Sequence, residues 1–359
     1  MSVSRLSEQL VKSGCRVRVF TTTANGQKEL PVVQNSEQQI AGVGVRYFKR
    51  LTKDHSHFSP ALLLALWKEV CSFSIVHIHT WWNLVSVLSC AIAISRRVPV
   101  VLSPRGTLSR YSFANRHSLL KWLFHKVIGA GLLNRCYLHA TSEAEQEALD
   151  MLLKPKGIFT IHNAVNLPVY IPERCPEAKV IKLLFFSRID PKKGLELLFE
   201  ALSGIPIPYQ LSIAGSGDEA YVAGLKKLSR QYQIDQNLTW LGFKQNNKFE
   251  VLARHHLLVL PSYDENFGNV VIESLSTGTA VLVSKAVGLS RYVAEHNLGW
   301  TCETNAASIR KQLTAIYFQR GSLNLIREFA PVMMAREFND EKLIRQYQEM
   351  YREILGQNA

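Results

Sequence analysis

The sequence lacks the features from which metal sites, disulfide frameworks and membrane spans are built. Its 359 residues include six cysteines, but these form no C-x-x-C pair, and no histidines stand at metal-ligand spacing. This scatter argues against structural zinc and against the disulfides of a secreted protein. No stretch reaches the ~20 apolar residues of a membrane span, and Arg5, Glu8 and Lys12 fall where a secretory signal would be apolar. We therefore expect a protein of the reducing cytoplasm, without structural zinc.

Negative charge is scarce in the first half of the chain. Residues 1–170 contain 20 Lys and Arg but only 9 Asp and Glu, whereas the remainder contains 22 and 20. Such an excess favours a polyanionic partner, either nucleic acid or anionic lipid headgroups; a basic surface that only keeps the protein soluble is the alternative. Because no compact motif interleaves basic with aromatic residues, nucleic acid is disfavoured. We expect the first half to face an anionic membrane surface, as a peripheral protein at the inner face of the cell membrane.

Two groups of side chains are candidates for that membrane surface. The first is Lys49, Arg50 and Lys53. The second surrounds a predicted amphipathic helix over residues 117–132 and comprises Arg110, Arg116, Leu119, Lys121, Trp122, Leu123 and Lys126. The alternative is that this helix packs its Trp122 face on a sheet and leaves only its basic face in solvent.

Short apolar runs alternate with amphipathic stretches from end to end, which is the pattern of a parallel α/β fold. A proline-rich stretch, Leu167–Pro176, separates two such runs. The tail Asp340–Leu355 places its apolar residues on one helical face. We predict two Rossmann-like domains, residues 1–168 and 177–339, followed by a C-terminal helix over about 340–359.

The chain opens on a predicted helix, with Val3, Leu6 and Leu10 at helical spacing and Gly14 as its C-terminal cap. A Rossmann domain begins with a strand and a Gly-rich turn before such a helix. Neither is present here, so the sequence predicts an N-terminal domain that lacks its first strand. Either the start codon is placed too late or the domain is truncated.

The segment Pro261–Glu273 carries the strongest functional pattern. It follows an apolar strand and leads into a helix, which places it at the carboxyl edge of a sheet, where such folds bind ligands. The N–H groups of Gly268–Val271 open the helix and can receive a phosphate. Glu265 and Glu273 can accept hydrogen bonds from vicinal sugar hydroxyls on both sides of a diphosphate. Taken singly, Glu265 is more simply explained as a solvated loop charge and Glu273 as a partner of the helix dipole. Taken together, the two carboxylates indicate a nucleotide sugar.

A second segment, Phe186–Gly194, again joins a strand to a helix. Arg188 and Lys193 leave the strand on one short loop, so both can converge on a diphosphate, Arg through its fork and Lys as a point charge. Positive charge there would stabilise a departing nucleoside diphosphate. Two solvated residues on a surface turn are the alternative, and we assign that solvated state to Lys192.

In chain order, these motifs resemble those of the family-four retaining glycosyltransferases, which have the GT-B fold. In the second half the resemblance rests on Ser187-Arg-x4-Lys193-Gly194, Ala214-Gly-Ser-Gly217, Leu241-Gly-Phe243 and Glu265-x7-Glu273. In the first half it rests on Ser103-Pro-Arg-Gly-Thr-Leu108, Ala140-Thr-Ser-Glu143 and Ile161-His-Asn-Ala-Val165. The implied fold is GT-B: two Rossmann-like domains facing across a cleft, with the final helix crossing back to the first domain.

The resemblance also implies a role for each motif residue. Arg188 and Lys193 would hold the donor diphosphate, Glu265 would bind the donor sugar as the third catalytic residue, and Glu273 would bind the nucleotide ribose. The other donor contacts would be Phe267, Gly268, Asn269, Val270, Gly242, Phe243 and Gly215. Many relatives place a His where this chain has Arg105; the first-half contacts Arg105, Gly106 and His79 are therefore less well defined by the resemblance.

The implied activity is transfer of a sugar from a UDP- or GDP-sugar to a glycan acceptor that is lipid-linked, in surface polysaccharide or glycoconjugate synthesis. The anomeric configuration would be retained and no metal cofactor would be needed. A nucleotide-sugar epimerase on the same fold is the alternative, but it would need acid and base residues that the sequence does not identify. A truncated, inactive relative also stays open, because the first strand is missing.

Overall fold

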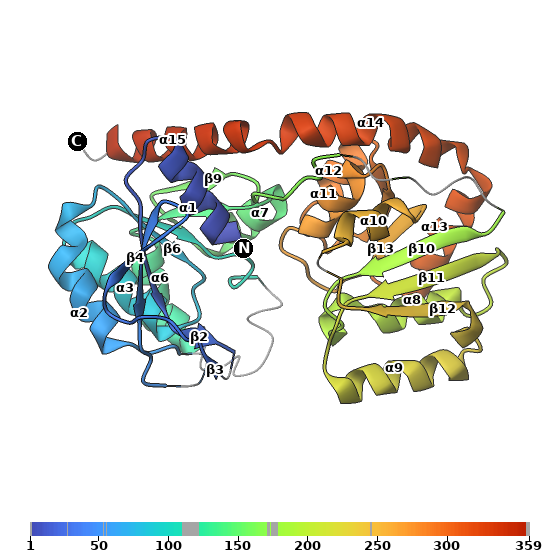
Figure 1. Cartoon of the computed structure of the whole chain (residues 1–359), viewed down its shortest axis with the longest axis horizontal. Helices are drawn as coiled ribbons and strands as arrows, with labels where there is room; N and C mark the ends of the chain where they lie inside the picture. Colours follow the sequence, from blue (N-terminus) through green and yellow to red (C-terminus); the bar gives the residue numbers. More distant parts are fainter. Residues whose placement is uncertain are drawn as a thin grey trace. The chain divides into compact units, whose positions relative to one another are not determined.

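The computed structural model describes residues 2–26, 28–52, 54, 56–109, 122–170, 173, 179–244 and 246–356. The chain divides into two compact units (Figure 1). One comprises Met1–Ala164 together with Asp340–Ala359, and the other comprises Val165–Asn339. Among the described helices, none combines the length and the apolar character that crossing a bilayer requires.

The second unit is built on a six-stranded parallel sheet. Its strands are β10 (Ile181–Phe186), β11 (Tyr209–Ala214), β12 (Leu238–Gly242), β13 (Leu257–Leu260), β14 (Ala280–Ser284) and β15 (Gly299–Cys302). They lie in the order β12-β11-β10-β13-β14-β15, and every pair is parallel. The order runs outward in one direction from β10 and in the other from β13, so the sheet has the doubly wound Rossmann topology with its switch point between these two strands.

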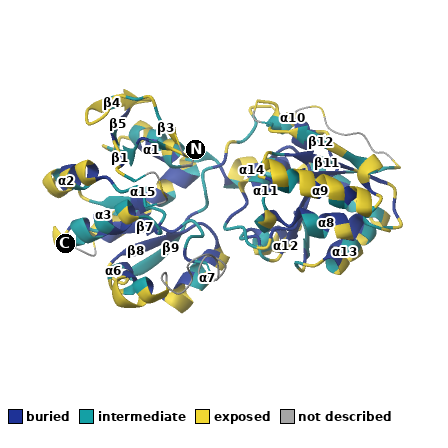
Figure 2. Cartoon of the chain, turned by 90° about the horizontal axis from the view of Figure 1, so that it is seen from below, coloured by how far each residue is buried: buried dark blue, intermediate teal, exposed yellow. Residues whose placement is uncertain are grey.

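Helices connect the strands of the second unit and cover its sheet. They are α8 (Leu195–Leu202), α9 (Glu219–Gln231), α10 (Lys248–Ala253), α11 (Asn269–Ser276), α12 (Ser290–Glu295), α13 (Ala306–Phe318) and α14 (Gly321–Glu337). All residues of β13 and β14 are buried, whereas much of α9 is exposed (Figure 2). A parallel sheet covered on both faces needs strands that are apolar throughout, which explains the sequences Leu-Leu-Val-Leu and Ala-Val-Leu-Val-Ser.

The first unit divides its strands between two main sheets. One is parallel, with the order β6 (Val76–His79), β7 (Val100–Ser103), β8 (Tyr137–Ala140) and β9 (Gly157–Thr160). In the other, β5 (Val43–Phe48) pairs in parallel with β1 (Arg18–Thr22) and antiparallel with β4 (Glu37–Ile40). A short hairpin joins β2 (Ala24–Asn25) to β3 (Lys28–Glu29). Within the described residues, no strand precedes α1 (Ser2–Lys12), and the antiparallel β4 departs from the parallel pattern that we predicted.

The helices of the first unit are α1, α2 (Pro60–Glu69), α3 (Leu84–Ser95), the π-helix η2 (His125–Gly129), α6 (Ala130–Leu133), α7 (Glu143–Leu152) and α15 (Asp340–Gly356). The helix α15 lies beside α1 (Figure 1), and Arg5 forms an ion pair with Asp340 at 2.8 Å. Leu6 and Leu10 of α1 share one apolar cluster with Tyr347 of α15. The last helix is therefore an integral part of the first unit.

Candidate functional site

The candidate site lies where the strand order of the second unit reverses. The strands β10 and β13 are direct neighbours, with Leu183 opposite Leu257. The loops that follow them meet at the carboxyl edge of the sheet, where Tyr263 N–H donates to Lys192 O at 2.9 Å. The crevice outside a switch point is the usual ligand site of doubly wound folds.

Ion pairs join the two loops of the switch point. The Lys193 ammonium contacts the Glu265 carboxylate directly, and Lys192 Nζ lies 2.5 Å from Asp264 Oδ2. Lys193 is buried, whereas Arg188 is exposed and has no hydrogen bond or ion pair with any residue that the structure describes. The structure thus brings Lys193 and Glu265 together and leaves Arg188 exposed on the same loop as Lys193. It also corrects our assignment of Lys192 as a solvated residue.

Gly268 begins α11 at this edge. Its φ of +89° is a left-handed conformation that favours glycine. The N–H groups of Gly268 and Val270 have no hydrogen-bond partner among the described residues, but Val271 N–H donates to Gly268 O at 2.8 Å. The helix start therefore offers the N–H groups of Gly268 and Val270 to a ligand, whereas that of Val271 is already used.

The Phe267 side chain is part of the hydrophobic core of the second unit. It is 2% exposed and packs in the core, with its ring edge against Phe338. Only the backbone of Phe267 can take part in binding. Asn269 is exposed and Val270 is half-buried at the start of α11.

Glu273 lies on the second turn of α11, and its side chain is 13% exposed. Its Oε1 atom accepts a hydrogen bond from Lys248 Nζ at 2.7 Å. Lys248 is the first residue of α10 and belongs to none of the sequence motifs. The loop before α10 begins with Gly242 at the end of β12 and with Phe243, whose side chain is 69% exposed.

Gly215 follows β11 and lies against the loop after β10. A Cβ atom added at Gly215 would lie 1.9 Å from Ser187 O. The absence of a side chain therefore lets these two loops approach each other. Gly215 shapes the edge of the sheet, whether or not a ligand contacts it.

The three candidates in the first unit lie together at the carboxyl edge of β6 and β7. Arg105 has a φ of +53°, and its guanidinium donates to His79 Nδ1 at 3.3 Å and to Asn163 Oδ1 at 3.1 Å. Gly106 N–H donates to Glu145 Oε1 at 2.7 Å. Burial lowers the pKa of His79 well below its ordinary value, consistent with a neutral ring that accepts from Arg105. The turn that carries Arg105 is thus fixed by partners within the first unit.

A buried chain of hydrogen bonds links the same strands to α15. His139 Nε2 lies 2.8 Å from Ile161 O; since a carbonyl can only accept, Nε2 carries the proton. His139 Nδ1 then accepts from Ser103 Oγ at 2.6 Å, Ser103 accepts from His77 Nε2 at 2.7 Å, and His77 Nδ1 accepts from the Tyr351 hydroxyl at 2.7 Å. Both histidines are neutral in this arrangement, and burial lowers the pKa of each.

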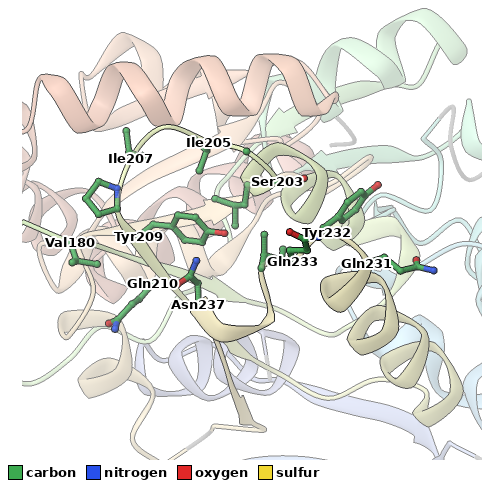
Figure 3. A pocket seen from close by; sticks show the side chains of 14 residues that line it. Val180, Ser203, Ile205, Ile207, Tyr209, Gln210, Gln231, Tyr232, Gln233 and Asn237 are labelled. Carbon is green, nitrogen blue, oxygen red and sulfur yellow. The ribbon is translucent and has the colours of Figure 1, made fainter.

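The second unit also contains a hollow of about 680 Å³ (Figure 3). It is lined by Tyr209 and Gln210 at the start of β11 and by residues 231–234 at the end of α9. These positions belong to the amino-terminal edge of the sheet, opposite to Arg188 and Glu265, so the hollow is not the predicted donor site. Among the described residues, no group of three His, Cys, Asp or Glu could hold a metal ion.

The candidate membrane surface of the first unit is only partly as predicted. Arg50 is 4% exposed and pairs with Glu29 at 2.7 Å, so its selection was wrong. Lys49 is exposed. Trp122 is 49% exposed, and Lys126 Nζ lies 4.6 Å from its ring centroid, so the alternative in which this face packs on a sheet is wrong. Lys53, Arg110, Arg116, Leu119 and Lys121 lie outside the described residues.

Comparison with known proteins identifies the class. Residues 1–168 match the family described as "Glycosyltransferase Family 4", and residues 173–330 match "Glycosyl transferases group 1". The chain therefore belongs to the family-four glycosyltransferases, enzymes that transfer glycosyl groups, as the motifs predicted. Its fold is that of the GT-B glycosyltransferases, with two Rossmann-like domains.

Individual relatives are distant. The chain is 23% identical over 214 residues to N-acetyl-alpha-D-glucosaminyl L-malate synthase of Bacillus anthracis, a match covering 57% of this chain and 56% of that enzyme. It is 22% identical over 324 residues to one of the subunits of human phosphatidylinositol N-acetylglucosaminyltransferase, covering 88% of this chain and 65% of that protein. The chain thus spans less than two thirds of either relative. The solved structure of Anabaena HepE with UDP and glucose superposes with a TM-score of 0.75 at 18% identity, covering 98% of this chain and 95% of that one.

Proposed function

We propose that the protein is a retaining glycosyltransferase that takes a sugar from a UDP- or GDP-sugar and transfers it to a glycan acceptor. The observation that carries this proposal is the contact between Lys193 and Glu265 at the switch point of the sheet, where Arg188 lies on the same loop as Lys193 and Gly268 begins α11. Cations and a helix start suit a diphosphate, and a carboxylate beside them suits sugar hydroxyls. The solved HepE complex with UDP and glucose supports a nucleotide-sugar donor.

In this proposal, the cations and the helix start stabilise the leaving diphosphate. Arg188 and Lys193 counter the negative charge that develops on the leaving oxygen as the bond to the anomeric carbon breaks. That oxygen takes the proton of the acceptor hydroxyl, and the acceptor attacks from the side that the diphosphate leaves. The anomeric configuration is then retained. Glu265 holds the donor-sugar hydroxyls in place, and Glu273 holds the ribose.

We further propose that the acceptor is lipid-linked and that the first unit faces an anionic membrane. Four large apolar side chains are exposed within one short stretch: Trp122, Leu123, Val127 and Ile128. Lys126 lies beside them. Exposed aromatic and aliphatic side chains next to a cation are typical of surfaces that bind the membrane interface. The human relative is named for phosphatidylinositol, a lipid, which is in keeping with a lipid acceptor.

The donor assignment is tested by calorimetric titration of the protein with UDP and with GDP. R188A and K193A should each weaken the preferred nucleotide by ~10- to 150-fold, the loss expected when a charged hydrogen bond is removed. K227A, which removes an exposed lysine of α9, should leave the affinity unchanged. Wild-type nucleotide affinity in both R188A and K193A would contradict the assignment of these residues to the donor diphosphate.

Retention is tested with a panel of UDP- and GDP-sugars in the absence of acceptor. The slow release of free sugar is followed by proton NMR before mutarotation scrambles the anomers. The sugar released first should have the anomeric configuration of the donor. Release of the opposite anomer would show an inverting reaction and contradict the proposal.

A further inference from the structure

A lysine outside every sequence motif contacts one of the two glutamates of the donor site. Lys248 Nζ donates to Glu273 Oε1 at 2.7 Å and lies 4.9 Å from the ring centroid of Phe249. The Lys248 and Glu273 side chains are 21% and 13% exposed. An ion pair that is largely shielded from water is screened less by salt than a surface pair and holds its geometry better.

This pairing leaves one oxygen of the Glu273 carboxylate available. Lys248 occupies Oε1, whereas no residue in the described part of the chain bonds Oε2. Glu273 lies little more than one helical turn after Gly268, where α11 begins. The salt bridge thus fixes the direction of the carboxylate and leaves Oε2 as an acceptor near the helix start that would bind phosphate.

The pairing also removes an electrostatic conflict. An unpaired carboxylate beside a phosphate site would repel an anionic ligand, and Lys248 supplies the charge that cancels this repulsion. The same solution occurs at the other glutamate, because Lys193 contacts Glu265. Each carboxylate of the site therefore has a lysine of its own, drawn from a different loop or helix.

We propose that Lys248 is a positioning residue of the donor site: it orients Glu273 toward the ribose diol of a nucleoside diphosphate and neutralises its charge. Lys248 begins α10, directly after the loop that carries Gly242 and Phe243, the predicted contacts to the base. It therefore links the base side of the site to the ribose carboxylate. This inference rests on the proposed nucleotide-sugar function.

The experiment measures binding of UDP, GDP and their 2′,3′-dideoxy analogues by calorimetry. K248M should weaken the preferred diphosphate ~10-fold, the loss expected when a charged hydrogen bond stops orienting its carboxylate. It should weaken the dideoxy analogue far less, because that analogue has no ribose diol. K248R should recover part of the affinity. The variant K248M/E273Q should bind no more weakly than E273Q, since the lysine acts through the glutamate.

The matched control is K285M. Lys285 pairs with Glu303 in the same unit, but both side chains are more than half exposed, at 63% and 56%, so this variant should bind UDP and GDP as the wild type does. Thermal unfolding checks that K248M is folded. If K248M is not folded, K248R is used for the same test. A smaller ratio of natural to dideoxy nucleotide affinity in K248R than in the wild type then supports the inference.

The outcomes separate the two proposals. A wild-type protein that binds UDP or GDP, together with a K248M variant of unchanged affinity, overturns the role of Lys248 alone. Equal losses for the natural and the dideoxy nucleotide also overturn it, because they indicate a general structural effect. A wild-type protein that binds neither UDP nor GDP overturns the proposed function, and the inference about Lys248 with it.

Discussion

We predict that the first unit loses stability as the pH falls through 6.5, because His139 stays neutral in the folded protein. His139 has no exposed surface, and burial lowers the pKa of its imidazole from 6.5 to about 4. Between these two values the unfolded chain binds a proton that the folded chain does not, so the free energy of unfolding rises with pH. Lowering the pH from 7.5 to 5.5 should remove ~1 kcal/mol through this residue, toward a limit of ~3 kcal/mol below pH 4.

The hydrogen-bond chain gives this loss a structural origin. A proton on His139 Nδ1 would face the Ser103 hydroxyl, which already donates to that nitrogen and accepts from His77. Protonation therefore requires the chain to reverse its hydrogen-bond directions, with Ser103 donating to His77 Nε2 and the His77 proton moved to Nδ1.

Urea unfolding at pH 7.5 and at pH 5.5, followed by tryptophan fluorescence, measures the effect. In H139Q the difference in the free energy of unfolding between the two pH values should shrink by ~1 kcal/mol. In H296Q, which changes an exposed histidine of the second unit, it should match the wild type. The same pH dependence in H139Q and in the wild type would refute the reasoning.

Three further predictions concern the site and the surface. E265Q should slow sugar release more than it weakens UDP or GDP binding, whereas E273Q should weaken the free diphosphate; equal losses of diphosphate affinity would contradict the division between sugar and ribose. G215A should lower the free energy of unfolding by at least ~3 kcal/mol in urea, because its methyl group would meet a carbonyl oxygen at 1.9 Å; wild-type stability would show that the loops can separate at little cost. The double variant W122S/L123S should lose co-sedimentation with anionic vesicles at low salt, and undiminished binding would refute the membrane surface.

The two loops of the candidate site could be selected from the sequence because their chemistry is local. A strand, a short basic loop and a helix start are each visible in a dozen residues, so Arg188 and Gly268 could be named from the sequence. The contact between Lys193 and Glu265, which are 72 residues apart, depends on the strand order that makes β10 and β13 neighbours. The motif spacing implied a shared site but no particular pairing of charges.

Lys248 could not be selected from the sequence, because a lysine at the start of a short helix is an ordinary surface pattern. Only the packing of α10 against α11 brings it to Glu273. The prediction for Arg50 was wrong for the opposite reason. In the sequence it has the pattern of a surface cation, but in the structure its guanidinium donates to Glu29 and to the carbonyl of Gly26. The helix α14 contains Pro331 in its interior, and because proline lacks the N–H that a continuing helix uses, the sequence pattern alone does not predict this helix.

The ion pair between Arg5 and Asp340 and the packing of α15 on α1 have a consequence for synthesis. The second unit is one uninterrupted stretch, Val165–Asn339, so it can fold as soon as that stretch has left the ribosome. The first unit is made first but cannot be completed until the last helix emerges. Until then, the apolar cluster around Leu6 and Leu10 lacks Tyr347 and the other side chains of α15. The unit whose synthesis starts first is thus the one that needs the last residues of the chain, and a chain cut short before residue 340 lacks the helix that covers this cluster.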